Sequence, residues 1–81
     1  MSENHFILYS TSNCHLCEDA LTLIQQYSAN LKLSIVDIVD DAECYSRYEF
    51  SIPVLKSNLT KTELNWPFDE EALVLFLSLN Q

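Results

Sequence analysis

Two cysteine residues, Cys14 and Cys17, are the side chains of this sequence that are best suited to chemistry. They belong to the segment Cys14-His15-Leu16-Cys17, at the point where a short apolar run gives way to helical spacing of apolar residues. This placement predicts a pair of thiols at the N-terminus of a helix. Backbone N–H groups and the helix dipole stabilise a thiolate there, and a thiol one turn later can resolve a mixed disulfide. The pattern indicates thiol–disulfide redox chemistry.

The charged neighbours of the two thiols act in opposite directions. Glu18 and Asp19 disfavour a thiolate, whereas the helix terminus and a protonated His15 favour it. We expect a pKa of the Cys14 thiol below that of a free thiol. The sequence leaves open whether His15 tunes the reaction or is only an exposed turn residue.

The third cysteine, Cys44, lies on a predicted second helix. A free cysteine is often buried as a small hydrophobic residue, and we favour this interpretation over a redox role. Structural zinc usually needs two closely spaced pairs of Cys or His, and this chain has one such pair. We therefore expect neither a metal nor a cofactor.

Composition narrows the class of protein. With 81 residues, of which 48% are hydrophobic and 20% charged, residues 1–81 have room for a single folded domain. The net charge is −8, and the fixed cations are only Lys32, Arg47, Lys56 and Lys61. We expect no nucleic acid partner, because few phosphates could be neutralised.

The N-terminal segment Met1 to His5 is polar and lacks the features of a signal peptide. No apolar run approaches the ~20 residues of a membrane span. We therefore expect a cytoplasmic protein without a membrane partner. In the cytoplasm a Cys-x-x-Cys pair is more often catalytic or metal-binding than structural.

The first half of the chain predicts a β-α-β unit. The run from His5 to Tyr9 is typical of a buried strand, with Tyr9 in the core, and helical spacing extends from Cys14 to about Ala29, where Asn30 would end the helix. Leu33 to Val39 is interpreted as a second buried strand, parallel to the first.

The second half predicts a short helix, a hairpin and a final helix. Asp40 and Asp41 offer an N-cap and a first-turn carboxylate for a helix that extends to Tyr48. Pro53 opens a strand from Ile52 to Leu55. A turn over 56–61 leads to an antiparallel edge strand over 62–65. Asp69 is the predicted N-cap of the last helix, whose apolar face holds Leu73, Phe76 and Leu77. The whole chain contains no glycine.

This order, β-α-β-α-β-β-α, with Cys-x-x-Cys after the first strand and Ile-Pro before the third, resembles the thioredoxin fold in its glutaredoxin-like form. The segments Leu8-Tyr9-Ser10, Cys14-His15-Leu16-Cys17-Glu18, Ile52-Pro53-Val54-Leu55 and Trp66-Pro67-Phe68-Asp69 are similar to a family of small bacterial glutaredoxin-like proteins. The resemblance implies an α/β domain with a four-stranded mixed sheet and helices on both faces.

The resemblance also implies roles for individual residues. Cys14 would be the nucleophile and Cys17 the resolving thiol. Pro53 would follow a cis peptide bond, and the backbone of Ile52 would pair with an extended substrate beside Cys14. The implied partner is a protein with a disulfide or a low-molecular-weight thiol, and we expect a monomer.

Glutathione-dependent members of the wider family carry a basic residue before the motif and a Gly-Gly turn before the last helix. Residues 10–13 contain no cation here, and Asn65-Trp66 replaces the glycines. Asp69 alone fits the pattern near the glutathione amine. Whether glutathione binds in the usual mode therefore stays open. For Trp66 and Phe68 we favour packing on the core over a substrate-contacting lip.

The leading hypothesis is a small dithiol–disulfide oxidoreductase that acts through Cys14 and Cys17, with His15, Trp66 and Asp69 as possible modulators. The first alternative is a non-enzymatic binding module that uses the Pro53 loop of the same fold. A second alternative is a metal or iron–sulfur protein.

Overall fold

The computed structural model describes residues 5–28 and 30–80. Eight elements follow one another along the chain: β1 (Phe6–Ser10), α1 (His15–Tyr27), β2 (Leu33–Asp37), the 3-10 helix η1 (Ile38–Asp40), α2 (Ala42–Tyr48), β3 (Val54–Ser57), β4 (Glu63–Asn65) and α3 (Glu70–Leu79). The predicted order of strands and α-helices is therefore confirmed. No helix within the described ranges combines the length and apolar character that a membrane span requires.

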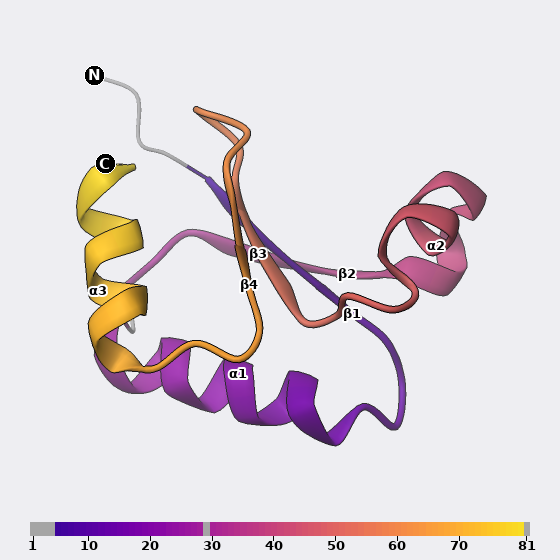
Figure 1. Ribbon diagram of the computed structural model, residues 1–81, viewed down its shortest axis with the longest axis horizontal. Coiled ribbons are helices and arrows are strands. Elements are labelled where there is room, and N and C mark those ends of the chain that lie inside the picture. Colours follow the sequence, from indigo (N-terminus) through magenta and orange to yellow (C-terminus); the bar gives the residue numbers. More distant parts are fainter. Residues whose placement is uncertain (1–4, 29, 81) are drawn as a thin grey trace.

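The four strands form one mixed sheet in the order β2-β1-β3-β4. β1 pairs with β2 in parallel, with Leu8 opposite Ile35, and it pairs with β3 in the antiparallel sense, with Leu8 opposite Leu55. β4 then pairs with β3 as an antiparallel edge strand. Helices α1 and α3 lie on one side of this sheet, and α2 lies at its far end (Figure 1).

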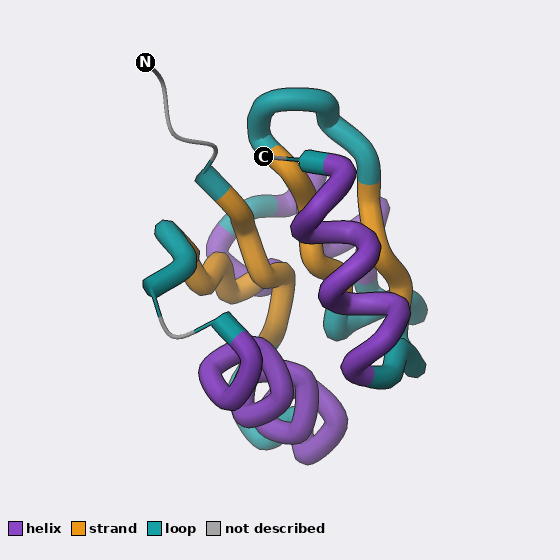
Figure 2. Tube along the Cα trace, turned by 90° about the vertical axis from the view of Figure 1, so that its left-hand side faces the viewer, coloured by secondary structure: helices purple, strands orange, loops and turns teal. Residues whose placement is uncertain are grey.

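Each face of the sheet carries its own apolar cluster, because side chains alternate along a strand. Phe6 and Leu8 of β1 join residues of α1 and α3 in the larger cluster. Tyr9 of the same strand joins Tyr48 of α2 and Val54 in the smaller cluster on the opposite face. The arrangement of α1 and α3 on their shared face is visible when the molecule is turned (Figure 2). The predicted four-stranded sheet with helices on both faces is confirmed.

Helix α1 is shorter than predicted. It begins at His15, with Cys14 as its N-cap, and it ends at Tyr27, where the backbone N–H of Ser28 donates to the Ile24 carbonyl oxygen. The predicted end near Ala29 lies outside the described residues, but the helix has already ended before Asn30 is reached. A left-handed residue lies at the opposite end of the helix, where Asn13 has φ 59° just before Cys14. Asparagine tolerates this conformation better than most residues.

The prediction of a second buried strand from Leu33 to Val39 was wrong in two respects. The strand ends at Asp37, whose side chain accepts a hydrogen bond from the Val39 N–H at 3.1 Å and so caps η1. The strand is also an edge strand, and the side chain of Ile35 is 55% exposed. A short apolar run alone does not distinguish an edge strand from a central one.

The predicted elements of the second half need smaller corrections. The N-cap of α2 is Asp41, one residue after the predicted Asp40, and it accepts hydrogen bonds from the N–H groups of Glu43 and Cys44. The third strand is displaced by two residues, since it begins at Val54 after Pro53. This displacement follows from proline chemistry, because Pro53 has no N–H to give to the sheet. The predicted apolar face of α3 is buried, and Asp69 is its N-cap.

Candidate functional site

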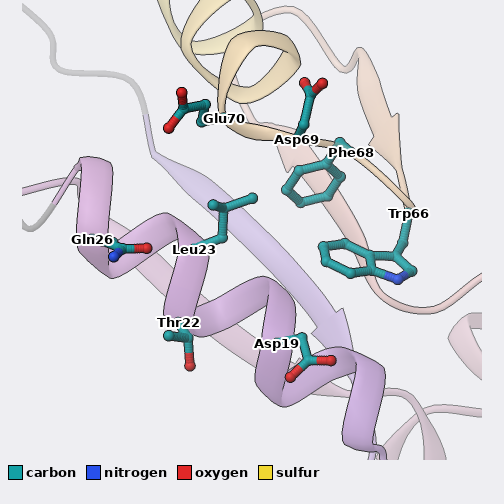
Figure 3. Close-up of a pocket in the computed structure, with 8 residues that line it drawn as sticks. All are labelled: Asp19, Thr22, Leu23, Gln26, Trp66, Phe68, Asp69 and Glu70. Atoms are coloured by element: carbon teal, nitrogen blue, oxygen red, sulfur yellow. The ribbon is translucent and has the colours of Figure 1, made fainter.

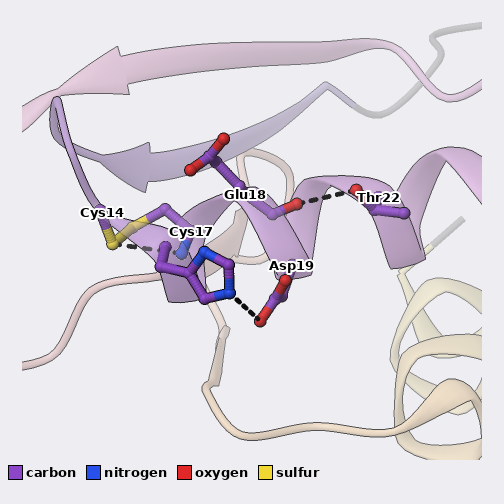
Figure 4. A network of polar contacts seen from close by, with 6 residues as sticks. Cys14, Cys17, Glu18, Asp19 and Thr22 are labelled. Atoms are coloured by element: carbon purple, nitrogen blue, oxygen red, sulfur yellow. Dashed lines mark hydrogen bonds and ion pairs between the residues drawn. A yellow bond between two sulfur atoms is a disulfide. The ribbon is translucent and has the colours of Figure 1, made fainter.

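Cys14 and Cys17 form a disulfide at the N-terminal end of α1 (Figure 4). Their Cα atoms are 5.2 Å apart, within the usual range for a disulfide. Cys14 is the N-cap of the helix, and its sulfur accepts a hydrogen bond from the Cys17 N–H at 3.1 Å. This donor stabilises negative charge on Cys14 once the pair is reduced.

The two sulfurs differ in their access to solvent. Cys17 is 3% exposed and belongs to the buried core, whereas Cys14 is only partly buried. A large partner can approach Cys14 more readily than Cys17. The asymmetry arises from the helix, because the N-cap residue lies at its open end while the residue three positions later faces the sheet.

His15 lies on the outer surface of α1, and its side chain is 85% exposed. Its Nε2 atom is 3.8 Å from the Asp19 carboxylate, one turn further along the helix. Such an exposed pair contributes little to stability. His15 therefore follows Cys14 directly in the sequence, and the Asp19 carboxylate is its charged neighbour on α1.

The residues predicted to hold substrate lie where β3 begins. Pro53 is buried, Ile52 is partly buried against the smaller cluster, and the peptide bond between them is cis. The Trp66 N–H donates to the Pro53 carbonyl oxygen at 3.3 Å, so the segment before α3 is joined to the Pro53 loop. The structure thus brings together two segments that are thirteen residues apart in the sequence.

Trp66, Phe68 and Asp69 connect β4 to α3. Phe68 is buried in the larger cluster together with Leu73, and Trp66 packs against that cluster from outside. The two aromatic rings meet edge to face with centroids 5.0 Å apart. Both Trp66 and Phe68 therefore pack on the core. Asp69 accepts a hydrogen bond from the Ala72 N–H at 2.8 Å, which gives this carboxylate a structural function as a helix cap.

Cys44 is a free cysteine on α2 and packs against the smaller cluster on the other face of the sheet. It lines a pocket of about 220 Å³ with Tyr9, Tyr48, Arg47 and Lys56 among its walls. Tyr48 donates a hydrogen bond to the Glu63 carboxylate at 2.5 Å. Burial of the Tyr48 hydroxyl is the largest cause that raises its pKa, and this hydrogen bond is the second. Within residues 5–28 and 30–80, His, Cys, Asp and Glu side chains form no group of three or more that could hold a metal ion.

A groove of about 410 Å³ lies between α1 and the segment from Trp66 to Glu70 (Figure 3). The α1 wall contains Asp19, Thr22, Leu23 and Gln26. This groove was not predicted from the sequence. The spacing of these four residues, at i, i+3, i+4 and i+7, was a detectable signal of one shared helix face, but the opposing wall comes from a distant segment.

Comparisons with known proteins agree with this geometry. The model of the glutaredoxin-like domain (DUF836) family matches residues 5–78. The crystal structure of target protein XcR50 from X. campestris has a TM-score of 0.83 at 36% identity, over 94% of this chain and 99% of that chain.

Two more distant structures share the fold. Protein Ne2328 from Nitrosomonas europaea has a TM-score of 0.70 at 22% identity, over 94% of this chain and 93% of that chain. Thioredoxin 1 from Thermosipho africanus TCF52B has a TM-score of 0.59 at 13% identity, over 93% of this chain and 96% of that chain. The chain has a thioredoxin-like fold and belongs to the glutaredoxin-like (DUF836) family.

Proposed function

We propose that this protein is a small dithiol–disulfide oxidoreductase that reduces protein disulfides or mixed disulfides. The observation that supports this most strongly is the position of Cys14, which caps α1, accepts the Cys17 N–H and is more exposed than its disulfide partner. These are the properties of an attacking thiolate and a protected resolving thiol.

The reaction proceeds in two exchange steps. The Cys14 thiolate attacks one sulfur of the substrate disulfide and forms a mixed disulfide, and the other substrate sulfur leaves as a thiolate that takes up a proton. Cys17 then loses its proton and attacks the Cys14 sulfur. The Cys14–Cys17 disulfide forms, and the second substrate sulfur leaves as a thiolate. Two electrons have passed from the dithiol to the substrate, and a thiol donor returns the protein to its reduced state.

The loop at Ile52 and Pro53 is the proposed platform for the substrate chain. It is anchored from two directions, because the Ile52 N–H donates to the Tyr48 carbonyl oxygen at 3.1 Å and the Pro53 carbonyl oxygen accepts from Trp66. An anchored loop holds an extended substrate segment in a fixed position, which favours attack by Cys14. His15, Trp66 and Asp69 then modulate binding or reactivity. The cytoplasm, where thiols are kept reduced, suits this direction of electron flow.

A disulfide-exchange assay with a thiol donor tests the proposal. The reduced wild-type protein should accelerate reduction of a peptide disulfide, and Cys14→Ala should lower the rate to that of the donor alone. When the thiol donor has been removed, reduced Cys17→Ala should instead accumulate a covalent adduct of the protein with half of the substrate, detectable by mass spectrometry. Cys44→Ala is the matched control, since it also removes one thiol, but on the opposite face of the sheet. Equal rates for the wild type and Cys14→Ala would contradict the proposal.

A further inference from the structure

The groove between α1 and the segment before α3 has an apolar floor. The side chain of Leu23 points from α1 toward Phe68, and the Trp66 ring lies beside them (Figure 3). Phe68 is buried, whereas Trp66 and Leu23 are partly buried and contribute to the wall. An aromatic face of this kind attracts the cationic head of lysine or arginine, while the apolar surface accommodates the methylene stem.

The rim of the groove is acidic. Asp19 of α1 and Glu70 of α3 lie on opposite walls, and Asp69 adjoins Glu70. None of the eight lining residues is a lysine, arginine or histidine. The Asp69 carboxylate caps α3, whereas Asp19 pairs with the exposed His15 and Glu70 accepts a hydrogen bond from the exposed Tyr27, two contacts that a charged ligand can replace. The hydrogen bond from Tyr27 to the negatively charged Glu70 raises the pKa of that tyrosine.

One end of the groove lies close to the redox motif. Asp19 follows Cys17 by two residues on α1, pairs with His15 beside the disulfide and also forms part of the groove wall. Trp66 lies at the same end of the groove as Asp19 (Figure 3), and it is hydrogen-bonded to the Pro53 loop. A polypeptide bound at Cys14 can therefore extend into the groove without leaving the surface of α1.

We propose that this groove binds a basic segment of polypeptide, with one arginine or lysine side chain against Trp66 and its charge beside Asp19, and a second basic side chain beside Glu70 at the opposite end of the groove (Figure 3). Its role as a selector of disulfide substrates rests on the redox function proposed above. Charge complementarity identifies the partner, because an acidic peptide would meet the carboxylates of both walls in a protein whose net charge is −8.

The chain supplies its own reporter of binding, since Trp66 is its single tryptophan and lines the groove. The oxidised protein is titrated with a capped peptide that alternates arginine and serine, and the tryptophan fluorescence is recorded. We expect a saturable change that weakens as salt is added. A peptide of the same length with citrulline in place of arginine keeps the shape but removes the charge, and it should bind at least tenfold more weakly.

Two paired variants separate binding in the groove from attraction to the whole acidic surface. Asp19→Asn with Glu70→Gln removes one carboxylate from each wall, and we expect binding to weaken about fivefold, as for two exposed ion pairs. Asp40→Asn with Glu43→Gln makes the same change in net charge at exposed residues of η1 and α2, and it should leave the affinity within twofold. Equal weakening by both pairs, or equal binding of the citrulline peptide, would overturn the proposal.

A kinetic measurement separates this proposal from the redox function. Disulfide-linked versions of the arginine and citrulline peptides serve as substrates for the reduced protein, and kcat/KM should be higher for the arginine peptide by the same factor as its affinity. Binding without reduction of either peptide would retain the groove assignment and reject the redox function. Reduction of both peptides at equal rates would do the reverse.

Discussion

The ionisation of the Cys14 thiol offers the most direct test of how this site is built. We consider Cys17→Ala combined with Cys44→Ala, which leaves Cys14 as the only thiol while the N–H of residue 17 is retained. Alanine is used because a serine hydroxyl at position 17 would itself donate to a thiolate. The folded protein should then have a Cys14 pKa below that of a free thiol.

The size of this effect follows from two interactions. A hydrogen bond to a charged acceptor contributes about 1.5 kcal/mol at the lower end of its range, and the N-terminus of α1 contributes about 0.5 kcal/mol. Their sum of about 2 kcal/mol raises the ionisation constant about 30-fold. The carboxylates of Glu18 and Asp19 oppose it but are exposed and screened, so we expect a net increase of about 10-fold to 30-fold.

The assay is the ultraviolet absorbance of the thiolate as a function of pH. A free cysteine is a few per cent thiolate at neutral pH, whereas a 10-fold to 30-fold larger ionisation constant makes Cys14 about a quarter to a half thiolate. The control is the same variant unfolded in urea, in which the N–H donor and the helix are lost. Identical titrations of the folded and unfolded forms would refute the reasoning.

The same shift has a consequence for stability. Because the folded state holds the thiolate more strongly than the unfolded state, the stabilisation is present above the ordinary pKa of a free thiol. It is lost as the pH falls through the lower pKa of the folded protein. The free energy of unfolding of the single-thiol variant should therefore rise across this window, and further substitution of Cys14 by alanine should abolish the rise.

Asp69→Ala should lower the free energy of unfolding by about 1 kcal/mol, or about 4–8 °C in Tm, whereas Asp69→Asn keeps the cap and should change it little; equal losses in thermal denaturation would contradict a capping role. Tyr48 donates a hydrogen bond to Glu63, and its pKa is raised in the folded protein. The stabilisation linked to this raised pKa is complete below about pH 10, the ordinary pKa of tyrosine, and the free energy of unfolding falls as the pH rises beyond it. Urea unfolding of Tyr48→Phe should show a smaller alkaline loss than the wild type. Phe50 is 94% exposed, so Phe50→Ser should change stability by less than about 0.5 kcal/mol in the same measurement.

Local signals in the sequence were sufficient for most elements but not for their environment. Asp69 was recognisable as a helix cap, and the cap of α2 was recognisable to within one residue of Asp41, because a cap depends on residues two or three positions away. The exposure of Ile35 was not recognisable, because it depends on β2 being at the edge of the sheet. Edge position is a property of the strand order, which no single strand encodes.

The candidate site divides in the same way. Cys14 and Cys17 lie within one turn, so their chemistry and their unequal burial follow from the start of a helix. The groove needs Asp19 and Glu70 on facing walls, although they are far apart in the sequence. Only the packing of α3 beside α1 places these two carboxylates along one groove, and helix packing of this kind is not visible in a short motif.

The absence of glycine has a consequence for the unfolded chain. A residue with a β-carbon has fewer accessible backbone conformations than glycine, so less conformational entropy is lost on folding, by about 0.4–1 kcal/mol per position. The folded state carries the opposing cost at Asn13 and Lys61, which adopt φ angles of 59° and 64°. For a chain of 81 residues with a modest core, a stiff unfolded state is a source of stability that leaves no contact in the structure. The turn that leads into Cys14 has asparagine at its left-handed position, and asparagine has fewer accessible backbone conformations than glycine.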